Sequence, residues 1–510
     1  MAGDKIDFEK WRLRTFVQKL IDIGDVEIHD EPVSLLELSS IIEATRKATL
    51  FRHVGPEGFE MVAAAGGSRR RLALALGVDD PRDCVNAYER RFNNPQPVIE
   101  VPSDEAPVHQ VVRTGDAIDL TKLPFHIQHK HDGCVYISSA IDYAVDPETG
   151  KGNVGCRRLM LRDRTTMRTN LTWASDLKRI YLGCVDRREK LPISFAIGAN
   201  PIDFMAATLR LPGDEFGLVG TLRGEPVPMV RGLTNGVLAP ADAELIIEGY
   251  LDERGYVEQE GPYGEFWGYY GPVHIDPVFH VTAITMRKDV LHQTVLHGTA
   301  SLVPTEAANV NSISAELRYL KVLRAANIEP TRVHSVVAAQ AHARVALRRG
   351  VRGQARRAIA ALFSLYDVKH VVVVDDDVDI YSDEEVEWAM STRFQADRDT
   401  VVGSDFTGPY MDPTLGQDGN VSKIGFDATA PYDLPDEITN WRPSPPHIQN
   451  PPRFQTVRRA LESGPLFFLQ IMEAVGSNDG REVALELGAL HDDGLLARGK
   501  NGEWILKALS

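Results

Sequence analysis

The chain of 510 residues has little cysteine, no excess of positive charge and no long apolar run. Its four cysteines, Cys84, Cys134, Cys156 and Cys184, include no CxxC pair and are too sparse for a disulfide framework, which indicates a reducing compartment. Lysine and arginine number 56 against 72 aspartate and glutamate, a formal net charge of -16 that argues against nucleic-acid binding. The start, MAGDKIDFEK, lacks the basic and apolar regions of a signal peptide. We therefore expect a cytoplasmic protein with no nucleic-acid or membrane partner.

Several familiar enzyme motifs are also missing. No GxGxxG opens a helix after a strand, and no GxxxxGK[ST] or GxSxG motif occurs, so dinucleotide folds, P-loop enzymes and α/β-hydrolases have no support. The acidic run 375–379 fails the EF-hand test, because Ile380 and Val386 stand where that loop needs glycine and glutamate. The loosely spaced His126, His129 and His131 are interpreted as a polar edge rather than a metal site.

The remaining pattern predicts several domains with sizeable cores, since 43% of the residues are hydrophobic and 25% are charged. Residues 1–100 are interpreted as a small α/β unit, with a first helix closed by Gly24 and a second begun by the capping-box pattern Ser34–Glu37. From 101 to 305 short β-type runs alternate with turns, which favours a barrel or sandwich. These runs include 135–141, 192–198 and 278–286.

The C-terminal half changes to α/β alternation. A helix over 306–326 lies in the linker segment 306–330, and residues 331–437 form an α/β domain in which Ser382 caps a helix. Strands are expected at 333–338 and 370–374, with a helix at 354–366. Residues 438–510 combine a proline-rich linker with a helical tail that ends in a hairpin around Lys500–Gly502.

The segment EGPYGEFWGYYGP, residues 260–272, contains two glutamates five positions apart. A strand would place Glu260 and Glu265 on opposite faces, and a helix would separate them by about 140°. Gly261-Pro262 followed by Gly264 predicts a tight turn, which can bring the two together. The turn is either a surface turn with two solvated acids or a pocket that pairs an acid with a base.

The same segment resembles the signature turn of the UbiD-like decarboxylases, which use prenylated flavin mononucleotide. Four further segments resemble that family in the same order: KGNVGCRRLM (151–160), DEFGLVGTLRGEP (214–226), residues 370–399 and SKIGFDAT (422–429). The resemblance covers residues 8 to 435 and implies an α+β multidomain fold. In that fold a central split β-barrel of the flavin-reductase type lies between the N-terminal α/β unit and a C-terminal α/β oligomerisation domain.

The resemblance also implies roles for single residues. Arg158 would bind the substrate carboxylate, Glu260 would orient Arg158, and Glu265 would move the proton that replaces carbon dioxide. Asn153 and Glu215 would bind a metal ion.

One position departs from the family, since TWASDLKRI (172–180) offers Asp176 where the family has a histidine ligand. Asp176 is a hard oxygen ligand, so it would complete a Mn²⁺ site with Asn153 and Glu215 at the flavin phosphate. K⁺ is a further candidate ion. The implied cofactor-binding set is Asn153, Val154, Gly155, Cys156, Arg157, Arg158, Ser175, Asp176, Glu215 and Lys423.

The implied function is non-oxidative, potentially reversible decarboxylation of an aromatic, heteroaromatic or α,β-unsaturated acid, with release of CO₂. The implied partners are a flavin prenyltransferase that supplies the cofactor and further copies of the chain, as a homodimer or higher oligomer. Two alternatives stay open. A conventional FMN-dependent reductase would oxidise a reduced nicotinamide, and a non-catalytic paralogue would bind an aromatic acid without releasing CO₂.

Overall fold

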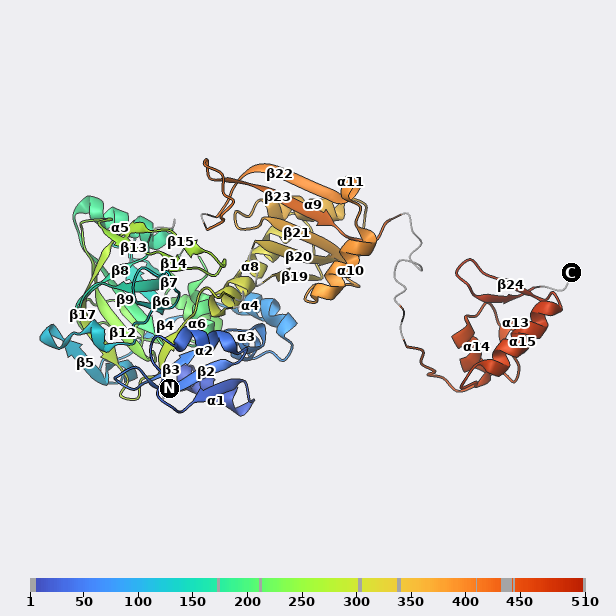
Figure 1. Ribbon diagram of the computed structural model, residues 1–510, viewed down its shortest axis with the longest axis horizontal. Coiled ribbons are helices and arrows are strands. Elements are labelled where there is room, and N and C mark those ends of the chain that lie inside the picture. The colour runs from blue at the N-terminus through green and yellow to red at the C-terminus, as the bar shows by residue number, and fades with distance from the viewer. Residues whose placement is uncertain are drawn as a thin grey trace. The chain divides into compact units, whose positions relative to one another are not determined.

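The computed structural model describes residues 6–171, 175–210, 213–300, 305–336, 341–409, 411–432, 443 and 445–507. The chain divides into two compact units, Met1–Ala428 and Thr429–Ser510 (Figure 1). Within the described ranges, none of the helices combines the length and the apolar composition needed to cross a membrane.

A closed antiparallel barrel forms the centre of the first unit. Its strands run in the order β12-β9-β6-β7-β8-β17, and β12 pairs again with β17 to close the ring, while β5 (Val111–Thr114) extends β17 on the outside. The interior is apolar, and Phe195 and Phe279 meet edge to face at 4.9 Å. The predicted central barrel is confirmed. The six strands are β6 (Tyr136–Val145), β7 (Gly152–Leu161), β8 (Thr166–Thr169), β9 (Leu191–Ile197), β12 (Leu245–Leu251) and β17 (Val278–Met286).

The N-terminal layer is a four-stranded sheet with four helices. The sheet order is β1-β2-β3-β18, and its last strand comes from residues far along the chain, after the barrel. Helix α1 buries Leu13, Phe16, Val17 and Leu20 at helical spacing. The elements are α1 (Leu13–Asp22), β1 (Val26–His29), α2 (Leu38–Ala44), β2 (Ala48–Val54), β3 (Phe59–Ala63), α3 (Arg69–Leu76), α4 (Cys84–Phe92) and β18 (His292–Thr294).

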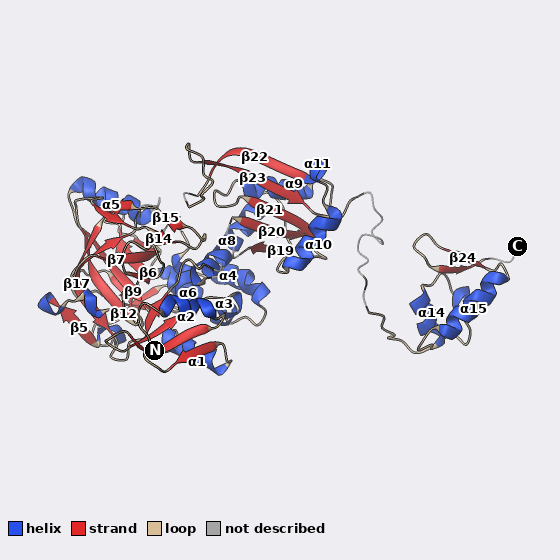
Figure 2. Cartoon of the chain, viewed as in Figure 1, coloured by secondary structure: helices blue, strands red, loops and turns tan. Residues whose placement is uncertain are grey.

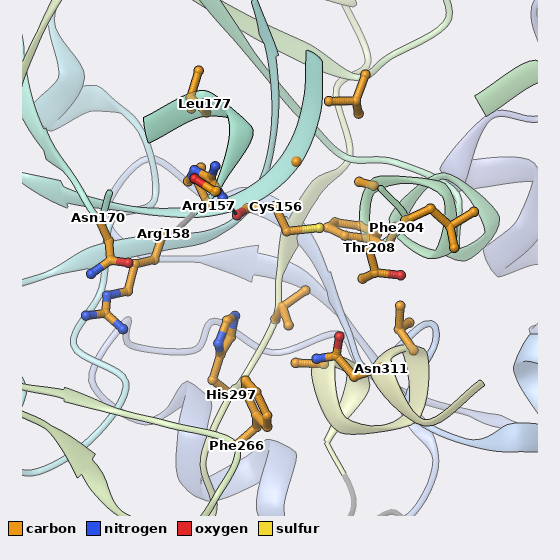
Figure 3. A pocket seen from close by; sticks show the side chains of 18 of the residues that line it. Cys156, Arg157, Arg158, Asn170, Leu177, Phe204, Thr208, Phe266, His297 and Asn311 are labelled. Atoms are coloured by element: carbon orange, nitrogen blue, oxygen red, sulfur yellow. Dashed lines mark hydrogen bonds between the residues drawn. The ribbon is translucent and has the colours of Figure 1, made fainter. Parts of the chain in front are cut away.

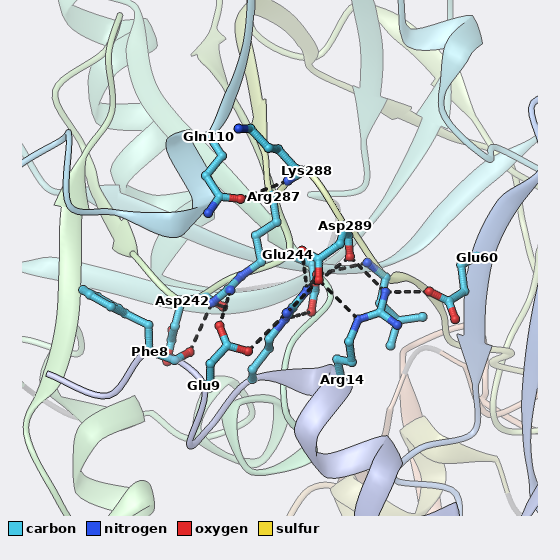
Figure 4. A network of polar contacts seen from close by, with 12 residues as sticks. Phe8, Glu9, Arg14, Glu60, Gln110, Asp242, Glu244, Arg287, Lys288 and Asp289 are labelled. Carbon is cyan, nitrogen blue, oxygen red and sulfur yellow. Dashed lines mark hydrogen bonds and ion pairs between the residues drawn. The ribbon is translucent and has the colours of Figure 1, made fainter.

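A polar network ties the start of the chain to the barrel (Figure 4). The buried Arg12 donates to both carboxylate oxygens of Glu244, at 2.8 and 3.2 Å, and to Asp289 at 3.1 Å. Arg287 donates to Glu9 at 2.6 Å. Because an unpaired buried charge is costly, each guanidinium here is matched by carboxylates.

Helix α8 (Glu306–Ala325) leads from the barrel to the C-terminal sheet, whose order is β19-β20-β21-β23-β22 (Figure 2). It contacts α4 and α6 on one side and β19 and α9 on the other. Ser382 caps α10 by accepting from the backbone of Glu385, as predicted. The elements of this domain are β19 (Arg332–Ser335), β20 (His342–Leu347), α9 (Gln354–Phe363), β21 (His370–Asp375), α10 (Asp383–Arg393), α11 (Ala396–Asp399), β22 (Thr400–Thr407) and β23 (Asn420–Asp427).

Shorter elements lie around the barrel. They are β4 (Val98–Glu100), α5 (Asp176–Arg187), α6 (Pro201–Ala207), α7 (Gly217–Arg223), β10 (Val227–Arg231), β11 (Leu238–Pro240), β13 (Glu258–Glu260), β14 (Tyr263–Gly264), β15 (Tyr270–Gly271) and β16 (His274–Asp276).

The second unit is small and has its own apolar core, which includes Leu461, Ile471 and Leu487. Its helices are α13 (Val457–Glu462), α14 (Phe468–Val475) and α15 (Arg481–Asp492). The predicted hairpin around residues 500–502 is present as β24 (Leu496–Arg498) and β25 (Trp504–Leu506).

Candidate active site

A cavity of about 360 Å³ lies against β7 in the first unit (Figure 3). Residues of β7 form one wall, α6 and the start of α8 form others, and the turn after β14 contributes Glu265 and Phe266. Its volume falls in the range of small-molecule and cofactor sites. The predicted residues that line it are Asn153, Val154, Gly155, Cys156, Arg157, Arg158, Ser175, Asp176, Glu215 and Glu265.

Arg158 is the centre of a buried ion cluster. It is 6% exposed and comes from β7, where it donates from Nε and Nη2 to the two oxygens of Glu260, both at 2.8 Å. Its third nitrogen, Nη1, donates to Glu265. Glu260 is fully buried and receives a further bond from Asn170 at 3.3 Å. The bidentate pair fixes the plane of the guanidinium, which a single contact would leave free to rotate.

The turn between the two glutamates brings them to the same arginine. Gly261 adopts φ +86°, a conformation that other residues avoid. Gly264 donates to Asp132 at 3.0 Å, and a side chain at Gly264 would collide with the ring of His129, 2.5 Å away. The Tyr263 ring centroid lies 4.5 Å from the Arg158 guanidinium carbon, a cation–π contact. Of the two interpretations of this turn, the structure shows the pocket.

The electrostatics of the cluster are set by burial and by its own charges. Burial alone lowers the pKa of Arg158, but the carboxylates of Glu265 and Glu260 outweigh it and raise that pKa well above its ordinary value. His297 lines the same cavity, and burial, with Arg158 nearby, lowers its pKa to about 4. At pH 7 the guanidinium is therefore charged and the imidazole of His297 is neutral.

The three predicted metal ligands line one stretch of the cavity. Glu215 accepts from the backbone of Val154 at 3.0 Å, and its own N–H donates to the carbonyl of Gly152 at 3.0 Å, so this segment is bound to the start of β7. The amide nitrogen of Asn153 donates to Asp142 at 3.4 Å, which leaves the amide oxygen as the atom presented to a cation. Asp176 is the first residue of α5, and its side chain is about half exposed.

These ligands fit a hard divalent ion. In the described part of the chain no three His, Cys, Asp or Glu side chains gather as a metal site, and the set here consists of two carboxylates and one amide. Oxygen-only ligands suit Mn²⁺ or Mg²⁺ rather than zinc. The adjoining wall combines the cations Arg157 and Arg210 with the apolar Phe204, Leu209 and Val310, which suits an anionic group attached to a flat ring system.

Besides Glu260, which adjoins the cavity through its bonds to Arg158, the predicted residue that the structure does not bring to the cavity is Lys423. It is buried on β23, where its ammonium donates to the carbonyls of Phe363, at 2.9 Å, and Leu365. These carbonyls belong to the end of α9, a place where cations are favoured. Burial lowers the pKa of Lys423 to about 8.

Sequence reasoning missed some of the lining. Asn170 and Glu306 were not singled out, because each stands alone in its segment with no spacing pattern around it. His297 was considered with His292, but only His297 lines the cavity; His292 packs against Phe59 instead.

Comparison with known proteins now assigns the family. Three domain profiles, described as the N-terminal, Rift-related and C-terminal domains of 3-octaprenyl-4-hydroxybenzoate carboxy-lyase, match residues 17–89, 99–300 and 308–428. The chain belongs to the UbiD family of carboxy-lyases. It is thus an enzyme of a decarboxylase family, with the three-domain architecture of that family.

Individual UbiD relatives match along most of the chain. Anhydromevalonate phosphate decarboxylase of Methanosarcina mazei is 32% identical over 82% of this chain and 95% of its own length. The UbiD-class enzyme HmfF from Pelotomaculum thermopropionicum, in complex with FMN, superposes with a TM-score of 0.79 at 32% identity, covering 85% of this chain and 97% of that one. An evolved dimeric form of HmfF in complex with prFMN gives 0.76 at 30% identity, with 86% and 97% covered.

Proposed function

We propose that this UbiD enzyme decarboxylates an aromatic, heteroaromatic or α,β-unsaturated carboxylic acid without net oxidation, using prenylated FMN. The observation that supports it best is the buried Arg158–Glu260–Glu265 cluster, which faces a cavity of cofactor size. Loss of CO₂ leaves an electron pair on carbon, and prenylated FMN supplies the electron sink that side chains lack. The reaction is potentially reversible, because the same groups would hold CO₂ and the product.

In this proposal Arg158 binds the substrate carboxylate. Glu260 occupies Nε and Nη2 at 2.8 Å each, so the nitrogen that remains for substrate is Nη1, now bonded to Glu265. A substrate carboxylate at Nη1 displaces Glu265 from the guanidinium and sets its carboxyl group beside the reacting carbon. Glu265 then donates the proton that replaces CO₂.

The cofactor would be held by the β7 wall and by a metal ion. Asn153, Asp176 and Glu215 would bind Mn²⁺ against the flavin phosphate, with Arg157 and Ser175 nearby on the same cavity wall. K⁺ is a further candidate ion. Lys423 has no part in this proposal, because its ammonium is bonded to the end of α9.

Two partners complete the proposal. A separate flavin prenyltransferase would supply the cofactor, so that a host without one yields inactive protein. The chain would form a homodimer or a larger homo-oligomer in the cytoplasm. The description of a dimeric form of HmfF supports the first state.

The test is co-expression with a flavin prenyltransferase, followed by measurement of CO₂ release from a panel of aromatic, heteroaromatic and α,β-unsaturated acids. We expect release from at least one acid, only by protein made with the prenyltransferase. Oxidation of a reduced nicotinamide by protein carrying plain FMN would instead favour a reductase. Binding of an acid without release of CO₂ would favour a non-catalytic paralogue.

A further inference from the structure

A second cavity, of about 220 Å³, adjoins the catalytic one. Its wall comes from the end of α2, the segment before α3 and the approach to α8. Arg46 and Lys47 line it and are exposed, so the cavity reaches the surface of the first unit. Most of its lining residues are polar or charged, although carbon atoms contribute much of the wall surface, and these residues offer hydrogen-bond partners to water.

Glu306 lines both cavities. It is the first residue of α8 and is 3% exposed, and its Oε1 accepts from the backbone N–H of Gly66 at 2.8 Å. Its other oxygen, Oε2, is buried and has no hydrogen-bond partner among the described residues. Glu306 thus lines both cavities and has one carboxyl oxygen that is free of partners among the described residues, so its carboxyl group can exchange a proton with water on either side.

The charged groups around Glu306 are mostly committed elsewhere. Arg69 donates to both oxygens of Glu316 at 2.7 Å, and Arg71 donates to both oxygens of Asp25 at 2.9 and 3.0 Å. Burial therefore dominates and raises the pKa of Glu306 to about 7, although the Gly66 N–H and Arg71 act in the opposite direction. The remaining titratable groups are Glu43, Arg46 and Lys47 on the second cavity, and Cys156, Arg157, Arg158, Asp176, Arg210, Glu215, Glu265, His297 and Tyr366 on the catalytic one.

The proposed reaction needs a supply of protons. The balance RCOO⁻ + H⁺ → RH + CO₂ consumes one proton from solvent in every turnover, and Glu265, which delivers it, is itself 6% exposed. His297 stays neutral at pH 7, since its pKa is about 4. It therefore does not supply this proton as an imidazolium.

We propose that Glu306 relays the proton from water in the second cavity to Glu265 in the catalytic cavity. This inference rests on the proposed function. A proton from solvent passes through water in the second cavity to the carboxylate of Glu306. The proton then passes through water in the catalytic cavity to the carboxylate of Glu265, which transfers it to the carbon that has lost CO₂. Glu306 acts through Glu265 and does not itself touch the reacting atoms.

The test is a rapid-mixing measurement of CO₂ release by cofactor-loaded Glu306→Gln. The glutamine oxygen can still accept from Gly66, but the side chain cannot carry the proton. Loss of CO₂ precedes the proton transfer, so the first turnover needs no relayed proton to release CO₂, and we expect a burst of one CO₂ per site. A steady state slower than wild type by roughly tenfold or more should follow. The solvent deuterium isotope effect should increase in this second phase, and kcat and KM should fall together, because the slowed step follows CO₂ release.

Two variants sharpen this test. Glu43→Gln makes the same substitution on the second cavity wall, at a residue that does not line the catalytic cavity, and should keep wild-type kinetics. Glu306→Asp keeps an ionisable group and should recover part of the lost steady-state rate. A structural role for Glu306 would slow the first and later turnovers equally, and that result would overturn the relay.

A second readout needs no cofactor. The infrared band of a protonated carboxyl group in the apoprotein should titrate near pH 7 and be missing in Glu306→Gln; its presence in both proteins would overturn the relay. Because the folded-state pKa of Glu306 lies above the ordinary 4.5, wild-type stability should fall as pH rises from 5 to 8, and Glu306→Gln should flatten this dependence.

If wild type releases no CO₂ from any acid, the proposed function fails, and the relay with it. If wild type turns over normally and Glu306→Gln matches it in both phases, the relay alone fails.

Discussion

At the scale of single residues, Arg158 shares its guanidinium unequally between two glutamates. Glu260 binds side-on through two bonds of 2.8 Å, whereas Glu265 binds through Nη1 alone. The geometry therefore distinguishes a fixed acid from an exchangeable one, although both are buried. The number of residues between Arg158 and each glutamate does not predict which of the two forms the two-bond contact.

Glu265→Gln should reduce CO₂ release by at least about 100-fold, because an amide has no acidic proton to donate. Cofactor loading should persist, since Glu265 bonds Arg158 rather than the residues proposed to hold the flavin. Flavin absorbance per chain and CO₂ release, measured on the same preparation, check both expectations. Near-normal decarboxylation by a fully loaded variant would remove Glu265 from the proton transfer.

Asp176 is the position at which we expect this chain to carry a carboxylate in place of the family's histidine ligand. Asp176→Ala should lose metal and bind flavin more weakly, because only Asn153 and Glu215 would remain as ligands and the flavin phosphate would lose the charge of the metal ion. Asp176→His should retain metal but lose it sooner as pH falls, since an imidazole is protonated below about 6.5. Elemental analysis and flavin occupancy of each variant provide the measurement. Full occupancy in the alanine variant would mean that Asp176 is not a ligand.

At the scale of elements, the contact between β7 and the segment before α7 aligns Asn153 with Glu215. A Cβ on Gly152 would lie 2.4 Å from the ring of Phe216, too close for both groups to keep their places. Gly152→Ala should therefore destabilise the first unit by about 1–3 kcal/mol and lower its metal content.

Thermal unfolding and metal analysis check the Gly152→Ala prediction. Gly183→Ala in α5 serves as the control, because its Cβ would meet nothing closer than 3.4 Å and alanine favours a helix. Equal metal content in both variants would contradict the importance of the contact at Gly152.

The sequence predicted helices and strands correctly where a single feature, such as a β-type run or a capping serine, determined the local structure. The runs 192–198 and 278–286 are strands β9 and β17, and Ser382 caps α10 as expected. Ser34 shows a failure. Its hydroxyl accepts from Leu36, at 3.1 Å, and so forms a local turn, and α2 begins only at Leu38. The Ser34 hydroxyl can accept from the N–H of Leu36 or, as a helix cap, from the N–H of Glu37. The capping pattern in the sequence does not show which of these two bonds forms.

The site was less accessible from sequence than the fold. The turn at 260–265 could be predicted because glycine and proline act locally, but neither its approach to Arg158 nor the burial of Glu306 follows from local rules. Lys423 is a residue that sequence reasoning placed in the site but that the structure places elsewhere. A motif placed it near the flavin, whereas packing places its ammonium at the end of α9.

At the scale of the whole molecule, the described residues that line the catalytic cavity all belong to the first unit. The second unit has a separate apolar core around Leu461, Ile471 and Leu487. A chain that ends after residue 442 should therefore keep flavin loading, decarboxylation and the unfolding temperature of the first unit. Spectra, CO₂ release and calorimetry of the shortened chain check this. Loss of flavin on truncation would show that the second unit supports the site.

The pairing of β18 with β3 affects how the protein is made in the cell. His292 pairs with Met61 and Thr294 with Ala63, so the N-terminal sheet lacks its last strand until some 230 further residues are synthesised. At about 5–20 residues per second this takes roughly 10–50 s, during which the open edge of β3 is available to other chains. Ribosomes that stall before residue 294 would release fragments that keep this edge open. Yield of soluble protein should therefore depend on translation speed and on chaperones that bind nascent chains.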